Sequence, residues 1–381
     1  MTKGGSESFD VIVAGLGAMG SAAAWQLAAR GLKVVGLDRY HPPHTLGSTH
    51  GGSRVIREMA FEHPRYVPLV RRAYRQWGEL EAQAGRQLLI PTGALYIGSP
   101  ASSVVAGSRA SAVEHGVGSE EMDGAAVHRR WPQFQPDPGM VGLFERRAGV
   151  LRPELCVEAM LGAAASAGAV LRFDEPMTEW RAGGQGITVR TPRETLTARH
   201  LVLALGPWMP DELARAGAEV WVERVIQHWF TPKDPELMDP SRCPIYLWED
   251  ADGVVFYGFP TLDGVVKAAV HHRGESVKAD AVRRDVSKEE VERARHYLAR
   301  WMPAADAGYV RSAVCLYTNA PDGDFIIDRH PEHGQVLLAS PCAGIGFKFA
   351  PTIGEILADL VQDRKPAFDL SPFALSRFRK R

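Results

Sequence analysis

Cysteine is scarce in this chain of 381 residues, and the positive and negative charges of the chain nearly cancel. The four cysteines lie far apart with no C-x-x-C pair, so neither a disulfide framework nor a zinc site is expected. A net charge of −1 lacks the basic excess that a nucleic-acid-binding surface needs. No apolar run reaches the roughly 18 residues that span a bilayer. The polar N-terminus, MTKGGSESFD, has no apolar leader core, which favours a cytoplasmic protein without membrane contact.

A dinucleotide-binding pattern occupies the first forty residues. A short apolar run ends at Ala14, and Gly15, Gly17 and Gly20 then follow the order G-x-G-x-x-G before an alanine-rich helical segment. The first glycine permits a tight turn, the second lets a pyrophosphate approach the backbone, and the third lets helix and strand pack closely. A second apolar run ends at Asp38, about where the ribose-binding acid is expected. The pattern predicts a bound ADP moiety and leaves open whether the cofactor is NAD or FAD.

The remaining pattern predicts two interleaved domains. Residues 221–270 alternate apolar and polar side chains, which is typical of an antiparallel sheet. Near the C-terminus a strand, a glycine turn and a last helix return to the pattern of the first unit. We therefore expect an α/β protein whose discontinuous cofactor domain holds an inserted, sheet-rich substrate domain. The predicted cofactor domain comprises residues 8–90, 146–220 and 318–381, and the substrate domain comprises 91–145 and 221–317.

A polar, glycine-rich segment, GSTHGGSRVIRE, carries Ser48, His50, Arg54 and Arg57. Its glycines would expose the backbone, as a loop around a ligand requires. The two arginines, three residues apart, would share one face of a helix. The alternative is a polar loop that caps the next helix, with its arginines paired to surface acids.

Lys267 and His271 lie in the apolar stretch GVVKAAVHH. Residues four apart on a strand point to the same side, so these two side chains could line one cavity. The alternative is a lysine at a sheet edge and a surface histidine pair. We predict no metal site there, because adjacent residues on a strand diverge and no acid or cysteine completes a ligand set.

Two further positions are ambiguous by themselves. Cys315, two residues before Tyr317, is apolar-flanked and could be an inert core residue. Lys348 follows Gly344 and Gly346, and it could be either a snorkelling stem or the cation of an anion pocket. A serine hydrolase is not indicated, because the G-x-S-x-G turn is missing.

Taken together, the motifs resemble the monomeric sarcosine oxidase and N-methyltryptophan oxidase family from Phe9 to Phe378. The similar segments are FDVIVAGLGAMGSAAA, PPHTLGSTHGGSRVIR, YVPLV, FYGFP, AVCLYT, DFIID-x-HPEH, GFKF and FDLSPFALSRF. The resemblance implies an FAD-binding Rossmann-type fold like that of p-hydroxybenzoate hydroxylase. It also implies FAD attached covalently through the Cys315 sulfur, and oxidation of N-methyl or cyclic secondary amino acids by O2.

The resemblance assigns roles to individual residues. Arg57 and Lys348 would hold the substrate carboxylate, and Lys267, with Arg54 as its cationic neighbour, would lie near flavin N5 and activate oxygen. His271 would lie beside the substrate amine, and Tyr257 and Tyr317 would line the pocket. The implied FAD-binding residues are Gly15, Gly17, Gly20, Asp38, Arg39, Ser48, Thr49, His50, Cys315, Gly344, Gly346, Phe347 and Lys348. No carboxylate base is evident in these motifs, and nearby cations would lower the amine pKa instead.

The substrate side chain stays open in this interpretation. Ile345 stands where the sarcosine and methyltryptophan enzymes commonly have histidine, and the flavin loop reads S-T-H-G-G-S-R. Sarcosine is the default substrate, and larger or cyclic amino acids are the nearest alternative. An NAD(P)-dependent dehydrogenase and a flavin-binding protein without catalysis are more distant alternatives. The resemblance to this family implies a monomer.

Overall fold

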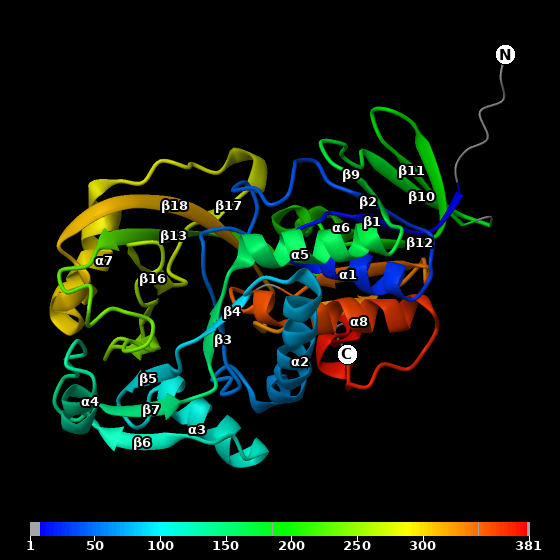
Figure 1. Ribbon diagram of the computed structural model, residues 1–381. Coiled ribbons are helices and arrows are strands. Elements are labelled where there is room, and N and C mark those ends of the chain that lie inside the picture. Colours follow the sequence, from blue (N-terminus) through cyan, green and yellow to red (C-terminus); the bar gives the residue numbers. More distant parts are fainter. Residues whose placement is uncertain (1–7, 185, 342, 379–381) are drawn as a thin grey trace.

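The structure is a computed structural model that describes residues 8–184, 186–341 and 343–378. The polar segment MTKGGSESFD, on which the expectation of a cytoplasmic location depends, therefore lies almost wholly outside the described residues, as does Cys342. Two large sheets and one small sheet organise the rest (Figure 1). No described helix is long and apolar enough to cross a membrane.

The first sheet is built around a parallel core. Its strand order is β10-β11-β12-β1-β2-β9, and β20 pairs with both β12 and β19. The strands are β1 (Ser8–Ala14), β2 (Val34–Leu37), β9 (Val170–Arg172), β10 (Glu179–Gly183), β11 (Gly186–Arg190), β12 (Thr195–Leu203), β19 (Ile326–Arg329) and β20 (Val336–Ser340). β12 and β2 flank β1 in parallel, and β20 adds to β12 in parallel. The C-terminal strand thus completes the N-terminal unit, as the sequence predicts.

Both faces of this sheet are covered, which explains the continuous apolar run of β1. Val11 and Val13 pack into the core formed with α1, α2, α5 and α8, and Ile12 and Ala14 face the opposite core with α6 (Figure 1). The α-helices of the described residues are α1 (Ala18–Ala29), α2 (Val67–Ala84), α3 (Ser103–His115), α4 (Gly124–Arg130), α5 (Pro153–Ser166), α6 (Pro210–Arg215), α7 (Lys288–Trp301) and α8 (Ala350–Val361). Helices α1 and α8 approach each other closely at Gly354. A Cβ at this position would lie only 2.6 Å from the Ala22 backbone.

The second sheet is mostly antiparallel. Its order is β17-β13-β16-β15-β14-β5-β7-β6, with β18 also paired to β13. The strands are β5 (Ala94–Gly98), β6 (Glu120–Asp123), β7 (Val141–Glu145), β13 (Trp221–Thr231), β14 (Ile245–Glu249), β15 (Val255–Gly258), β16 (Val266–His271), β17 (Ser276–Val277) and β18 (Gly308–Asn319). Helix α7 covers one face (Figure 1), and a Ser287–Glu290 capping box fixes where it begins. The other face turns toward the first sheet and carries the site residues.

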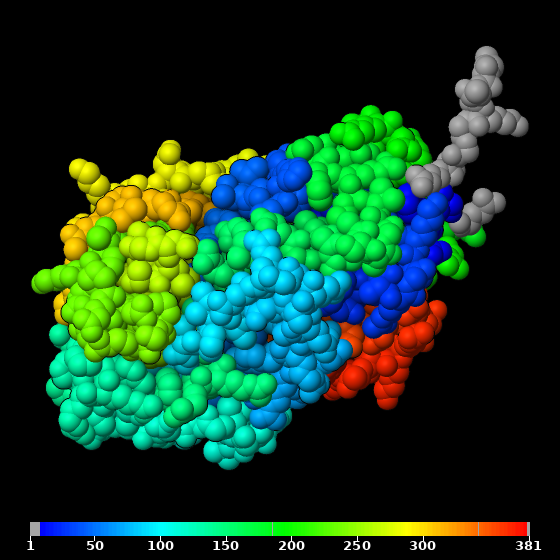
Figure 2. Space-filling model, in the orientation of Figure 1, coloured from blue at the N-terminus to red at the C-terminus, as the bar shows by residue number. Residues whose placement is uncertain are grey.

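A third, three-stranded sheet joins the two halves, and the sequence did not predict it. It consists of β3 (Arg54–Ile56), β8 (Gly149–Leu151) and β4 (Leu89–Pro91). Figure 2 shows the light-blue segment around residues 60–90 between the left part of the molecule and the red C-terminal part. The helix face predicted for Arg54 and Arg57 is wrong: Arg54 begins a strand, and its pairing with β8 replaces local helical bonds.

Candidate active site

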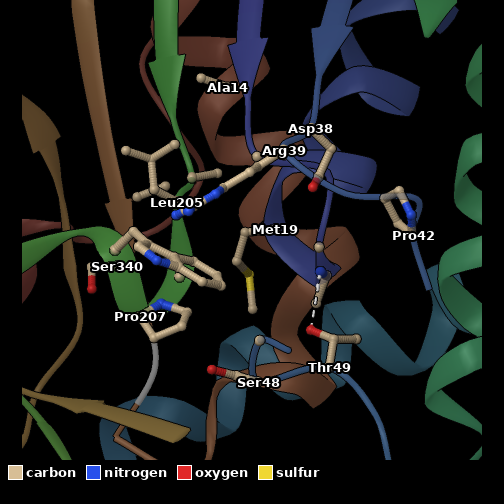
Figure 3. A pocket seen from close by; sticks show the side chains of 18 of the residues that line it. Ala14, Met19, Asp38, Arg39, Pro42, Ser48, Thr49, Leu205, Pro207 and Ser340 are labelled. Atoms are coloured by element: carbon tan, nitrogen blue, oxygen red, sulfur yellow. Dashed lines mark hydrogen bonds between the residues drawn. The ribbon is translucent and has the colours of Figure 1, made fainter. Parts of the chain in front are cut away.

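A cavity of about 660 Å³ lies where the parallel strands end. Its walls are the turn after β1, the end of β2, the loop through residues 42–49, and the segments that follow β12 and β20. In Figure 3, Met19 on α1, Asp38 after β2 and the loop residues Ser48 and Thr49 surround the same space. Cavities of roughly 300–1,000 Å³ beyond the carboxyl ends of such strands are typical ligand sites.

The glycine motif has the geometry that its spacing predicts. Gly15 adopts φ +85°, and a Cβ there would lie 2.5 Å from the Ala204 carbonyl oxygen. A Cβ on Gly20 would lie 1.6 Å from the Gly15 oxygen, so this glycine permits close packing and does not line the cavity. Gly17 faces the cavity, and only Thr49 Oγ1 comes near its Cβ position, at 3.6 Å. The first turn of α1 is therefore open to an anionic group.

Asp38 is positioned by the backbone on both sides of it. Its carboxylate accepts hydrogen bonds from the Leu16 N–H (2.7 Å) and the Tyr40 N–H (2.9 Å). The neighbouring Arg39 also lines the cavity and pairs with Asp280 at 2.8 Å. A glycine cradle, a helix N-terminus and an acid at the ribose position all fit the adenosine diphosphate half of FAD.

A second, smaller cavity of about 70 Å³ adjoins the first. Arg54, Tyr317, Gly344 and Phe347 line both cavities, so the two spaces meet at these residues. The small cavity is lined by every residue predicted to be catalytic or to bind the substrate, and by the predicted flavin-linked cysteine: Arg54, Arg57, Tyr257, Lys267, His271, Tyr317, Lys348 and Cys315. Side chains far apart in the sequence therefore converge where the larger cavity ends.

Lys267 is buried inside the sheet, with 3% of its surface exposed. Its ammonium donates to Gly51 O (3.0 Å), Ser53 O (2.7 Å) and Gln227 Oε1 (3.2 Å). Burial, and then Arg54, hold the pKa of Lys267 well below its ordinary value, while the three acceptors favour the charged form. The sheet-edge alternative is wrong, because β16 runs between β13 and β15.

Arg57 and Lys348 form the cationic wall of the small cavity. Glu62, which the sequence analysis missed, also lines this cavity and accepts a hydrogen bond from Arg57 at 2.5 Å. Burial, and then Arg57, lower the pKa of Lys348 to about 7, although Glu62 acts in the opposite direction. Burial raises the pKa of Glu62, but Arg57 and Lys348 outweigh it and leave that pKa below its usual value. Lys348 is buried, so the snorkelling alternative is wrong.

His271 and the two tyrosines form another part of the lining of the small cavity. The Tyr317 hydroxyl and His271 Nδ1 are 3.5 Å apart, and the Tyr257 ring lies edge-on to the His271 ring. Burial, and then His272, hold the pKa of His271 well below its ordinary value, so His271 is neutral at physiological pH. Gly344 packs directly on this pair: a Cβ there would lie 2.5 Å from the Tyr317 ring and 2.7 Å from His271.

Cys315 lies on β18 beside the junction of the two cavities. Its neighbour Leu316 lines the large cavity, and Cys315 lines the small one. Arg54 Nη2 lies 3.8 Å from Cys315 Sγ and also donates to Ser48 O, and the Ser48 hydroxyl donates to Leu316 O. The loop and the cysteine strand are thus tied together where a ring between the two cavities would lie.

His50 is near Arg54 and Lys267 but does not reach either cavity. It is buried and lines neither cavity, and its Nε2 has no partner among the described residues. Burial, and then Arg54 and Lys267, lower the pKa of His50 to about 3. A contact between the His50 ring and a ligand is therefore not evident in this arrangement.

Comparisons with known proteins agree with this geometry. The profile of the FAD-dependent oxidoreductase family matches residues 10–360. The chain belongs to that family. It is 42% identical over 360 residues to a monomeric sarcosine oxidase of Streptomyces avermitilis (93% of this chain, 94% of the relative). It is 34% identical over 373 residues to an N-methyl-L-tryptophan oxidase of Salmonella arizonae (97% and 99%). The solved structure of NikD, an unusual amino acid oxidase essential for nikkomycin biosynthesis, superimposes with a TM-score of 0.86 at 26% identity (97% and 98%).

Several predictions from the sequence are thereby confirmed. The family resemblance and the FAD-binding α/β fold are both supported, and the enzyme is an FAD-dependent amine oxidase. The match to an FAD family also favours FAD over the NAD(P) alternative. The roles of single residues, the domain boundaries and the covalent bond to Cys315 stay predictions.

Proposed function

We propose that this protein is an oxidase of small secondary amino acids, with sarcosine as its default substrate. The observation that carries the proposal is that two cationic side chains, Arg57 and Lys348, line a small cavity that opens into the FAD-sized one. Similarity to sarcosine and N-methyltryptophan oxidases supports it. The balanced reaction converts sarcosine, O2 and water into glycine, formaldehyde and hydrogen peroxide.

In this proposal Arg57 and Lys348 bind the substrate carboxylate. Charge-assisted hydrogen bonds to each cation contribute roughly 1.5–3 kcal/mol. Glu62 compensates part of their charge while the cavity is empty, because it is already paired with Arg57. The substrate's methyl and amine groups would then lie toward His271, Tyr257 and Tyr317, which line the same cavity.

The amine must lose its proton before its carbon can give up hydride. Arg54, Arg57 and Lys348 lower the amine pKa through their positive charge, and neutral His271 can accept a hydrogen bond from the N–H. When FAD is bound it accepts the hydride and passes two electrons to O2. Lys267 supplies the positive charge that favours this electron transfer.

We further propose that FAD is attached through the Cys315 sulfur. Support comes from the place of Cys315 at the cavity junction and from Arg54, whose charge would stabilise the reacting thiolate. Wild-type protein unfolded in acid should keep its yellow colour in the polypeptide fraction, and Cys315→Ser should lose it. Release of all the flavin from wild type would refute the covalent bond.

The second candidate is an oxidase of larger or cyclic amino acids. Ile345 lines the small cavity together with Leu247 and Val255, an apolar surface that suits an aliphatic side chain or ring. The deciding experiment is anaerobic bleaching of the flavin by a panel of N-methyl and cyclic amino acids. Fastest bleaching by sarcosine supports the first candidate, and fastest bleaching by proline, pipecolate or N-methyltryptophan supports the second. No bleaching by any member would overturn both.

We propose that the enzyme acts as a monomer and divides into the two domains predicted above. The name of the sarcosine oxidase relative supports the monomer. The separate sheets support the division, although β18 extends two residues past the predicted boundary at 317. Size-exclusion chromatography with light scattering tests the first proposal, and limited proteolysis tests the second. A stable dimer, or cleavage confined to regions inside the proposed domains, would contradict them.

A further inference from the structure

A partly buried loop before β3 lies between two charged side chains, one on α5 and one on β16 of the second sheet. On one side of the loop is Glu154, in the first turn of α5. On the other side is Lys267, whose ammonium points at the loop's carbonyl oxygens. The loop itself is Gly51–Gly52–Ser53.

The Glu154 carboxylate is bound by the backbone of this loop. It accepts the Gly51 N–H at 2.6 Å and the Gly52 N–H at 3.1 and 3.2 Å. Gly51 and Gly52 both have positive φ, +100° and +73°. Successive residues with unusual backbone angles can turn their N–H groups toward one point and create a small anion-binding concavity. Here a carboxylate of the protein fills that concavity.

The carbonyl side of the loop holds Lys267. Gly51 O and Ser53 O accept two of its ammonium protons, and Gln227 Oε1 accepts the third. A Cβ at Gly51 would lie 2.1 Å from Gln227 Oε1, so glycine is needed for this arrangement. The peptide group between Gly51 and Gly52 therefore binds the Glu154 carboxylate through its N–H and the Lys267 ammonium through its C=O, and each interaction strengthens the other.

The other charges near Lys267 are mostly positive. Arg54 on β3 and Arg311 on β18 are cations that act on it, Cys315 is a thiol, and Glu154 is the carboxylate that opposes the cations. His50, from the same loop, is neutral at physiological pH because of its burial. Trp229 and Phe259 complete the surroundings with uncharged rings.

We propose that Glu154 is a positioning residue that keeps Lys267 protonated and held in the wall of the small cavity for the oxygen step. The inference rests on the proposed function of Lys267, and it assigns a role to a residue outside both cavities. It predicts that removal of the Glu154 charge impairs electron transfer to oxygen and leaves flavin reduction by the amino acid much less affected.

The test uses holoenzyme whose flavin has been reduced photochemically, so that no substrate is needed. Return of the flavin absorbance after mixing with oxygen is followed from about pH 6 to about pH 9. In Glu154→Gln the amide oxygen can still accept a hydrogen bond but the charge is gone. We expect reoxidation about tenfold slower near neutral pH, with its alkaline limb moved about one unit lower, because the cation loses its compensating charge. Glu154→Asp should restore most of the rate.

Glu158→Gln is the matched control, one turn further along α5, where the carboxylate is exposed and paired with Arg86. It should behave like wild type. A readout independent of the flavin is hydrogen exchange of the Gly51 and Gly52 amides, which Glu154→Ala should accelerate and Glu158→Ala should not. A wild-type pH profile in Glu154→Gln, or unchanged amide exchange in Glu154→Ala, would overturn the proposal, as would wild-type reoxidation in Lys267→Met. Failure of the amino acid panel to bleach the wild-type flavin would instead reject the proposed substrate.

Discussion

At the scale of single residues, the small cavity depends on charges that are removed from water and differ in how they are satisfied. Lys267 has three acceptors, whereas Lys348 donates to one carbonyl oxygen, that of Ile345, at 3.0 Å. Burial lowers the pKa of both lysines, and that of Lys348 falls to about 7. Lys348 is therefore a binding group that is only partly charged at neutral pH.

The lowered pKa of Lys348 predicts that substrate binding depends on pH. A neutral Lys348 cannot pair with a carboxylate, so KM should be lowest below pH 7 and should rise as pH increases through about 7. Below pH 7, Lys348→Met should raise KM by roughly ten- to a hundredfold, which corresponds to the loss of about 1.5–3 kcal/mol, and at alkaline pH its KM should approach that of wild type, in which Lys348 is then neutral. Lys348→Arg should bind without this alkaline limb, because a guanidinium stays protonated.

The measurement is KM against pH at saturating oxygen, in wild type and both variants. The arginine variant also controls for ionisation of the substrate amine, which affects all three proteins alike. An identical alkaline limb in Lys348→Arg would show that another group titrates.

At the scale of elements, the turn that joins β1 to α1 separates two functions of glycine. Gly20 meets backbone from the preceding turn, and Gly17 meets the cavity. Gly20→Ala should destabilise the protein, because its Cβ would lie 1.6 Å from the Gly15 oxygen and the backbone must shift. Overpacking of this kind costs about 1–3 kcal/mol or more.

Gly17→Ala should instead fold normally and bind FAD poorly. Its Cβ would touch only Thr49 Oγ1 at 3.6 Å, an ordinary contact, and the backbone φ of −66° suits alanine. The methyl group would occupy the space that the pyrophosphate needs. Thermal unfolding of the apoprotein and flavin content after purification test this pair of variants. Full flavin content in Gly17→Ala would contradict the placement of the pyrophosphate.

The same turn shows what local sequence can predict. Gly15, Gly17, Gly20 and Asp38 lie within one strand–helix–strand unit, so their geometry follows from spacing alone. The placement of Arg54 and Glu62 does not, because β3 forms only by pairing with β8 almost a hundred residues later. A three-residue strand has too little periodicity to be distinguished from a helical turn. Likewise, Gln227 and Glu154 meet Lys267 only through tertiary contacts, and no motif marks them.

At the scale of the whole molecule, the active site is the place where the two large sheets and the small one meet. The parallel sheet provides the FAD-sized cavity, the antiparallel sheet provides Lys267, His271 and Tyr317, and the small sheet provides Arg54. The resemblance could predict which residues gather there, because the motifs are specific. It could not predict the free-energy cost of burying titratable groups, because that cost depends on how deeply each group is buried in the folded protein.

His228, which lines neither of the two cavities just described, illustrates that cost. It lies on β13, on the face toward α7, and its Nδ1 is 2.8 Å from Ser312 Oγ. Burial lowers the pKa of His228 from 6.5 to about 4. The unfolded chain therefore binds a proton at a pH where the folded protein does not, and stability present at neutral pH is lost as pH falls from about 6.5 to about 4.

The free energy of unfolding should accordingly fall by about 3 kcal/mol over this range through His228 alone, at about 1.36 kcal/mol per unit of pKa difference. Urea unfolding of wild type and His228→Gln at several pH values measures it: the variant should be less stable at pH 7 and should lose less stability on acidification. His296→Gln, at an exposed position on α7, is the control and should follow wild type. If the free energy of unfolding falls equally on acidification in wild type and in His228→Gln, His228 takes up its proton equally well in the folded and unfolded chains. In that case the packing of α7 against β13 leaves room for water to reach His228.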